Sequence, residues 1–170
     1  MRSTRILPVD ADRPEGGEGI LDGPGPGLEA PVRILVAEAE DAHLSMQTSA
    51  LEKAGFHLDL AGDGGAARAF LASNAYATIV ADAGLGGLDT IGLLRAARRR
   101  DLDVPLLLVT DAAHVGLSAV AVQQGALCFL EKPVTPDLLC GTLAYAVKLY
   151  RLAKLRRKAL GELGGTWNQL

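Results

Sequence analysis

The feature that most constrains the fold is a regular alternation of short apolar runs with segments of helical spacing. Each run has four to six residues, and apolar residues then recur every three or four positions in the segment that follows. The expected strands are 32–37, 56–61, 77–81, 104–109 and 127–130, and the expected helices are 42–54, 66–73, 90–100, 115–124 and Pro136 to about Leu160. Such alternation predicts a doubly wound α/β fold, a parallel sheet with helices on both faces.

Composition supports a single domain with an aliphatic core. Hydrophobic residues make up 49% of the 170 residues and aromatic residues only 4%, as expected where Leu, Val, Ile and Ala fill a parallel sheet. The net charge of −3 gives no reason to expect nucleic acid or a membrane as a partner. No apolar run approaches the ~20 residues that span a bilayer. Without a signal-peptide pattern, the expected location is cytoplasmic.

The chain divides into three parts. Residues 1–31 are rich in Gly, Pro and acidic residues, and we expect a disordered tail because such a segment buries little apolar surface. Residues 32–150 form the expected domain. Residues 151–170 are expected to be a helical extension with a frayed C-terminus, since Gly161, Gly164 and Gly165 follow its last apolar positions.

Polar residues collect where the expected strands end. Because parallel strands end at one edge of a sheet, where ligands of such folds bind, these residues should lie together. They are Glu38, Glu40 and Asp41 after the first strand, Asp82 after the third, Thr110 after the fourth and Lys132 after the fifth. A carboxylate such as Asp82 can attack phosphorus, neighbouring acids can hold Mg²⁺, and Thr110 and Lys132 can hold phosphoryl oxygens.

Four ordered motifs resemble the receiver domains of response regulators, the chemotaxis-type receivers of two-component signalling. They are residues 34–40, resembling the first strand and acidic turn; 76–89, the phosphoacceptor strand and loop; 105–110, the strand with the switch hydroxyl; and 125–133, the last strand with its Lys-Pro. The resemblance covers about residues 32–150. It implies a flavodoxin-like sheet of strand order 2-1-3-4-5, followed by an extended C-terminal helix.

The resemblance also implies a function and a set of site residues. Asp82 would accept a phosphoryl group from a histidine kinase or a histidine phosphotransfer protein, so the domain would be a phosphorelay switch rather than an enzyme. Asp82, Glu38 and the backbone carbonyl of Gly84 would hold Mg²⁺, with Glu40 or Asp41 as further candidates. Thr110 and Phe129 would move on phosphorylation, with Phe129 turning inward, and Lys132 would contact the phosphate.

Partners would read the surface that changes with these movements. By resemblance, that surface consists of helix 115–124, strand 127–130 and the helix after Pro136. The Lys132–Pro133 peptide bond would be cis.

Some residues depart from the family pattern, and two of these departures concern Mg²⁺ and phosphate binding. Ala39 stands where the family has a second acid, which is usually the direct metal ligand, so Mg²⁺ binding would be weak. Asp111 follows Thr110 where a small residue is common, and its charge would repel a phosphate. These departures support an alternative, a degenerate receiver that works as a protein-interaction or dimerisation module without phosphorylation.

Two other patterns suggest further hypotheses. Residues 62–67 match the G-x-G-x-x-A form of a dinucleotide-binding turn, although this turn follows the second strand instead of the first. In the last helix, Leu149, Leu152 and Leu155, followed by Ala159 and Leu163, have near-heptad spacing. Homodimerisation through this helix is therefore a hypothesis, as is linkage to an output domain.

Overall fold

The computed structural model describes residues 32–39, 42–85 and 89–167. Strands and helices alternate as predicted. The elements are β1 (Arg33–Ala37), α1 (Ala42–Lys53), β2 (His57–Ala61), α2 (Gly64–Ser73), β3 (Thr78–Asp82), α3 (Thr90–Arg100), β4 (Leu106–Thr110), α4 (Val115–Gln123), β5 (Cys128–Glu131) and α5 (Pro136–Trp167).

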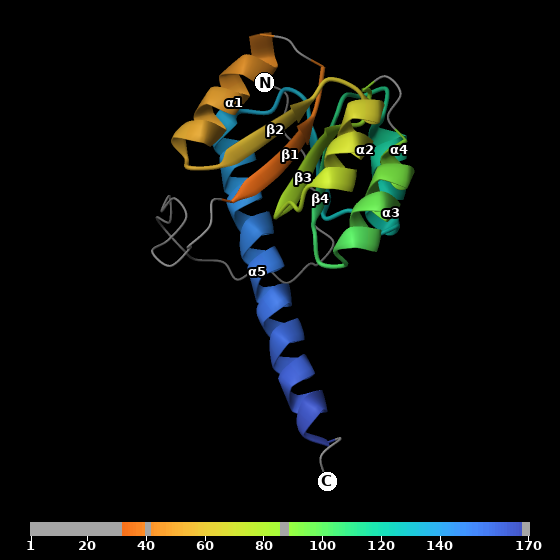
Figure 1. The fold of residues 1–170 in the computed structure, drawn as a ribbon. Coiled ribbons are helices and arrows are strands. Elements are labelled where there is room, and N and C mark those ends of the chain that lie inside the picture. Colours follow the sequence, from red (N-terminus) through yellow and green to blue (C-terminus); the bar gives the residue numbers. More distant parts are fainter. Residues whose placement is uncertain (1–31, 40–41, 86–88, 168–170) are drawn as a thin grey trace, which may run out of the picture.

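The five strands form one parallel sheet in the order β2-β1-β3-β4-β5. This confirms the predicted doubly wound fold. Helices α1 and α5 cover one face of the sheet, and α2, α3 and α4 cover the other (Figure 1). The register places the ends of β3 and β4 level, with Asp82 beside Val109, and those of β4 and β5 level, with Thr110 beside Glu131.

The core follows from the continuous apolar runs of the central strands. Every residue of β4 is buried, and so are the first four residues of β3, because helices cover both faces of a parallel sheet. Leu35, Ile79 and Leu108 point into one hydrophobic cluster, and Val36 and Leu107 point into the other. Cys128 lies in the second cluster, and burial raises the pKa of its thiol to about 11.

Local sequence signals set several helix ends. Gly55 and Gly125, which follow α1 and α4, have φ values of 88° and 105°, a region that L-residues rarely adopt but that glycine, without a Cβ, adopts freely. Asp63 and Asp89 cap α2 and α3 by accepting hydrogen bonds from Ala66 N and Gly92 N. The Asp63 cap explains why α2 begins at Gly64, before the predicted start.

Helix α5 is longer than predicted. The expected end near Leu160 falls short, because the helix continues through Gly161, Gly164 and Gly165 to Trp167. A glycine inside a helix costs about 1 kcal/mol relative to alanine but keeps its N–H donor, so it weakens a helix without breaking it. The last turns of α5 project well beyond the body of the domain (Figure 1). None of the helices in the described ranges is long and apolar enough to cross a membrane.

Candidate functional site

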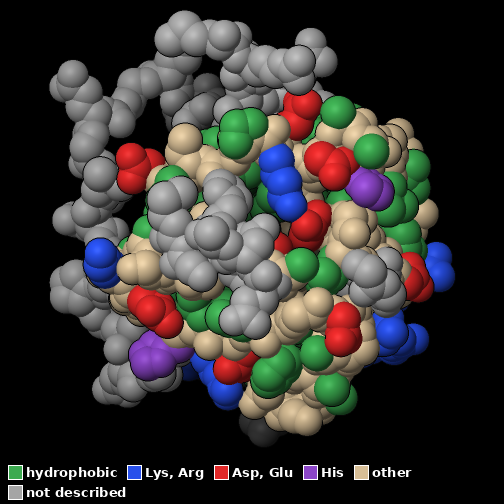
Figure 2. Space-filling model, turned by 90° about the horizontal axis from the view of Figure 1, so that it is seen from above, with side chains coloured by type: hydrophobic (Ala, Val, Ile, Leu, Met, Phe, Trp, Pro, Cys, Tyr) green, Lys and Arg blue, Asp and Glu red, His purple; other side chains and the backbone are tan. Residues whose placement is uncertain are grey.

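The carboxyl edge of the sheet gathers the predicted site residues that the structure describes. Glu38 follows β1, Asp82 ends β3, Thr110 ends β4 and Lys132 follows β5. Figure 2 looks down on this edge and shows a basic side chain in the middle of the face with acidic side chains around it. The parallel arrangement of the strands explains why these residues lie together, since the carboxyl ends of all five strands are at this edge.

Lys132 lies between two carboxylates. Its Nζ is 2.7 Å from Asp82 Oδ2 and 3.6 Å from Glu38 Oε1. The Glu38 side chain is only 4% exposed and that of Asp82 13% exposed. Carboxylates so far from water need a compensating charge, and the Lys132 ammonium supplies it.

The surroundings of Lys132 keep its ammonium protonated. Burial works to lower the pKa of Lys132, but the hydrogen bond to Asp82 and the charges of Asp82, Glu38 and Asp111 outweigh it, and the pKa is raised. The site therefore keeps a fixed positive charge beside the Asp82 oxygens, where a transferred phosphoryl group would carry negative charge.

The loop after β3 holds the other oxygen of Asp82. Gly84 N donates a hydrogen bond to Asp82 Oδ1 at 2.9 Å, so both carboxylate oxygens are engaged by described residues. The predicted further ligands Glu40 and Asp41 lie outside the described residues.

The two predicted switch residues are both buried. Thr110 is fully buried, and its Oγ1 donates a hydrogen bond to Asp111 O at 3.2 Å. Phe129 is 3% exposed and belongs to the hydrophobic cluster under α2, α3 and α4. The Lys132–Pro133 bond that follows is cis.

A pair at the start of α4, Asp111 with His114, was not expected from the sequence. Asp111 Oδ1 accepts hydrogen bonds from Ala113 N and His114 N and lies 2.8 Å from His114 Nδ1. The hydrogen bond from His114 is the main reason why the pKa of Asp111 is lowered. Asp111 is thus held by its own turn, and its charge also helps to raise the pKa of Lys132 in the Asp82 site.

The imidazole of His114 also lies against the loop after β3. A Cβ built on Gly84 would come within 3.1 Å of the His114 ring, so only a residue without a side chain fits there unless the ring shifts. The histidines are scattered in the sequence without a spacing pattern, and only the approach of α4 to this loop could reveal the contact.

The donors at this edge fit a hard cation that retains water ligands. Mg²⁺ prefers oxygen ligands and commonly takes one or two carboxylates, keeping several waters. The Glu38 and Asp82 carboxylates approach the same ammonium, and the Gly84 backbone adjoins Asp82. Ala39 adds no donor, and in the described part of the chain no three His, Cys, Asp or Glu side chains converge on a metal-sized site.

The glycine-rich turn at residues 62–67 contains the N-cap of α2. The Asp63 carboxylate accepts the Ala66 N hydrogen bond at 2.8 Å and occupies the N-terminus of α2. In a dinucleotide site, the pyrophosphate would occupy this position, and the Asp63 charge would repel it. The small residues here serve the turn and the close packing of α2, in which Ala67 is fully buried.

The fold and the site together define a class of protein, a doubly wound domain with a carboxylate, a lysine and a hydroxyl at the carboxyl edge of its sheet. The family model for the response regulator receiver domain matches residues 34–144. The chain therefore belongs to the response-regulator receiver family. Proteins of this family are signalling switches in phosphorelays, and Mg²⁺ binding at the phosphorylation site is general among them.

Several transcriptional regulators are similar in sequence. The C4-dicarboxylate transport transcriptional regulatory protein DctD of Rhizobium meliloti is 31% identical over 134 residues, which are 76% of this chain and 29% of DctD. The transcriptional regulatory protein FixJ of Bradyrhizobium diazoefficiens is 33% identical over 115 residues, which are 68% of this chain and 56% of FixJ. This chain thus spans less than two thirds of the length of these relatives.

Solved structures show the same fold. Full-length FixJ from B. japonicum matches with a TM-score of 0.67 and 27% identity, over 82% of this chain and 68% of FixJ. A CheY-like receiver domain protein from Methanospirillum hungatei matches with a TM-score of 0.67 and 22% identity, over 73% of this chain and 99% of that protein. The second likeness concerns the fold alone.

Proposed function

We propose that this chain is a phosphorylatable receiver whose phosphoacceptor is Asp82. The observation that carries the proposal is the position of Lys132, which contacts Asp82 at 2.7 Å and faces Glu38 at 3.6 Å. Thr110 ends the neighbouring strand at the same level of the sheet. Nucleophile, cation and hydroxyl thus come from three adjacent strands.

The chemistry assigns one role to each side chain. A carboxylate oxygen of Asp82 attacks the phosphorus of a phosphohistidine on a histidine kinase or a histidine phosphotransfer protein. The phosphorus–nitrogen bond breaks, an acyl phosphate forms, and the imidazole of the partner leaves with the bonding electron pair. Lys132 neutralises the phosphoryl oxygens, and the hydroxyl of Thr110 donates a hydrogen bond to one of them.

Glu38, Asp82 and the Gly84 carbonyl are the residues that would hold Mg²⁺. When bound, the cation supplies positive charge to the phosphoryl oxygens during transfer. With Ala39 at the position of the second acid, we propose weak Mg²⁺ binding, with Glu40 or Asp41 as candidates for additional ligands.

Readout would follow from the movement of Thr110 toward the phosphate. Phe129 lies on β5, next to β4. Its ring would change position as Thr110 moves toward the phosphate. The face of α4, β5 and α5 then changes for a downstream protein partner. Leu117 and Val120 on α4 and Tyr145 on α5 are exposed, as expected of a binding face. Like response regulators generally, the protein would act in the cytoplasm.

The test is the intact mass of the protein after incubation with Mg²⁺ and a small-molecule phosphodonor. We expect one phosphoryl adduct, lost in Asp82→Asn. The matched control is Asp89→Asn, because Asp89 caps α3 at the same end of the domain and takes no part in the proposed chemistry. An adduct that persists in Asp82→Asn would contradict the assignment of Asp82.

A second candidate function rests on Ala39. Without a second acid, the chain can act as a degenerate receiver that presents its α4-β5-α5 face or its last helix regardless of phosphorylation. A folded protein that gains no adduct with any donor, and that gains one in Ala39→Asp, would favour this second function.

A further inference from the structure

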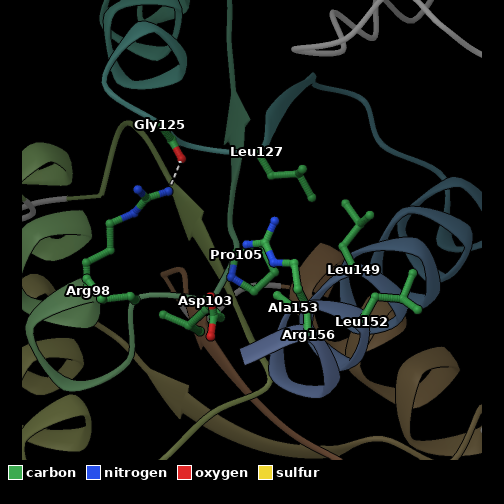
Figure 3. A pocket seen from close by; sticks show the side chains of 11 residues that line it. Arg98, Asp103, Pro105, Gly125, Leu127, Leu149, Leu152, Ala153 and Arg156 are labelled. Carbon is green, nitrogen blue, oxygen red and sulfur yellow. Dashed lines mark hydrogen bonds between the residues drawn. The ribbon is translucent and has the colours of Figure 1, made fainter. Parts of the chain in front are cut away.

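A pocket of about 430 Å³ lies at the opposite edge of the sheet from Asp82 (Figure 3). Its floor is formed by Val104 and Pro105, which precede β4, and by Leu127, which precedes β5. One wall belongs to the projecting part of α5, with Leu149 and Leu152. Leu152 is 53% exposed, so the pocket presents apolar surface to solvent.

Two guanidinium groups flank this apolar surface. Figure 3 shows Arg98 entering from α3 and Arg156 from α5. Arg98 donates a hydrogen bond to Gly125 O, a neutral acceptor, and in the part of the chain that the structure describes its Nε is buried without a hydrogen-bond partner. No ion pair joins Arg98 or Arg156 to a carboxylate among these described residues.

The acids beside the pocket form ion pairs with other cations, and the charge of Arg156 also contributes to lowering the pKa of Asp103. Asp103 lines the pocket, but its carboxylate accepts two hydrogen bonds from Arg157, at 2.8 and 2.7 Å. Asp101 is paired with Lys154 at 2.7 Å. The pocket therefore favours an occupant that combines apolar side chains with negative charge.

The chain itself contains such a segment, which precedes β1 in the sequence. Residues 14–31 carry four acids, Glu15, Glu18, Asp22 and Glu29, and no Lys or Arg, and Ile20-Leu21 directly precedes Asp22. This segment joins the domain at Val32, immediately before β1. The register aligns the start of β1 with the start of β4, two strands away, a separation of about 10 Å.

The length of chain is sufficient for the contact. Leu21 lies eleven positions before Val32, and a chain of that length reaches at most ~40 Å. A segment tethered so closely has an effective concentration on the order of millimolar, so that a weak contact is enough to populate the bound form.

We propose that the acidic segment around Ile20-Leu21-Asp22 docks into this pocket, with its apolar side chains against Leu149 and Leu152 and its carboxylates toward Arg98 and Arg156. Docking covers the exposed side of Leu152. The N-terminal segment is thereby an intramolecular ligand of α5, a role separate from the chemistry at Asp82.

The experiment is paramagnetic relaxation enhancement on the full ¹⁵N-labelled chain. A spin label is attached to Cys introduced as Gly19→Cys, with Cys140→Ser to remove the partly exposed native thiol; Cys128 is buried. We expect broadening of the amide signals of residues 149–156. The broadening should be lost in Arg156→Glu and at high salt, since salt screens exposed charges, and should return in Arg156→Glu with Asp22→Lys.

The matched control is Lys148→Glu, the same charge change at an exposed position of α5 that does not line the pocket. Broadening of residues 149–156 should persist in this control. Broadening that is equal in the wild type and in Arg156→Glu would reflect the tether alone and overturn the proposal. Broadening seen only between spin-labelled and separately ¹⁵N-labelled chains would also overturn it, and would identify a second copy as the occupant.

Discussion

At the scale of single residues, the site at the carboxyl edge places Lys132 between two carboxylates and has an alanine, Ala39, next to one of them. Lys132 balances Glu38 and Asp82, while Ala39, which is exposed, contributes no charge. A bound cation would compete with the Lys132 ammonium for the oxygens of Glu38 and Asp82. Two substitutions test this view.

Ala39→Asp should strengthen Mg²⁺ binding. An additional carboxylate raises the affinity of an oxygen site for a hard cation, and we expect roughly a tenfold gain, equivalent to about 1.4 kcal/mol. The affinity is measured by titrating the protein with Mg²⁺ and recording the NMR chemical shifts of residues next to Asp82. Ala113→Asp is the control, because Ala113 is also an exposed alanine at this end of the domain. Equal affinities in wild type and Ala39→Asp would mean that position 39 does not face the cation.

Lys132→Met should lower the stability of the protein when a chelator removes Mg²⁺, and added Mg²⁺ should restore part of that stability. The substitution removes the ammonium that faces the nearly inaccessible Glu38 and Asp82 carboxylates, and we expect a loss of about 2 kcal/mol in the free energy of unfolding. Urea unfolding with EDTA and with excess Mg²⁺ measures this loss, which Mg²⁺ should reduce. Lys53→Met, at an exposed position of α1, should change little. Unchanged stability of Lys132→Met in EDTA would disprove the proposed balance.

At the scale of elements, the beginning of the α5 projection is fastened to the loop between α3 and β4. Tyr150 donates a hydrogen bond to Asp101 Oδ2 at 2.8 Å, Lys154 pairs with the same oxygen, and Arg157 donates two hydrogen bonds to Asp103. These contacts extend over two turns of α5 and set the direction in which the helix leaves the domain.

Asp101→Asn should weaken this attachment in a pH-dependent way. Burial works to raise the pKa of Asp101, but hydrogen bonds from Lys154, Asp103 N and Tyr150 outweigh it, and the pKa lies below its ordinary value of 3.8. Its stabilising contribution is therefore complete well above pH 3.8 and is lost as the pH falls through the folded-state pKa.

We expect Asp101→Asn to cost about 1 kcal/mol at neutral pH, a value reduced for the exposure of Lys154. The difference from wild type should shrink below about pH 3.8. Urea unfolding as a function of pH measures it, with Glu52→Gln, an exposed acid on α1, as the control. A difference that is independent of pH would exclude the Asp101 charge as its cause.

At the scale of the whole molecule, the main feature is α5, whose C-terminal part projects beyond the rest of the domain. Leu155 and Leu160 lie on the projecting part of α5 and are 64% and 62% exposed. A helix of this kind gains stability by pairing its apolar stripe with another helix.

Leu155→Glu should therefore reduce self-association. Sedimentation velocity over a range of concentrations should show a monomer–dimer equilibrium for the wild type and a shift toward monomer for the variant, since a charge at a packed apolar position opposes helix pairing. Leu60→Glu alters an equally conspicuous exposed leucine, on β2, and should leave the equilibrium unchanged. A wild type that remains monomeric at all concentrations would refute pairing through α5.

The sequence by itself determined the layers of this protein and the chemistry of its edge. Apolar runs predict strands and helical spacing predicts helices because both periods are local properties of the backbone. With the family motifs, they placed Asp82, Thr110 and Lys132 at one edge of the sheet. Gly55 and Gly125 marked helix ends for an equally local reason, the positive φ of their turns.

Only the tertiary structure decided which distant side chains meet. Arg157 and Asp103 are 54 positions apart, and Tyr150 and Asp101 are 49 apart. No periodicity links such residues, because their contact depends on how helix and loop project from the packed sheet. The same holds for His114 against Gly84 and for the pocket beside α5. The extension of α5 to Trp167 also escaped prediction, because glycine lowers helix stability without preventing the helix.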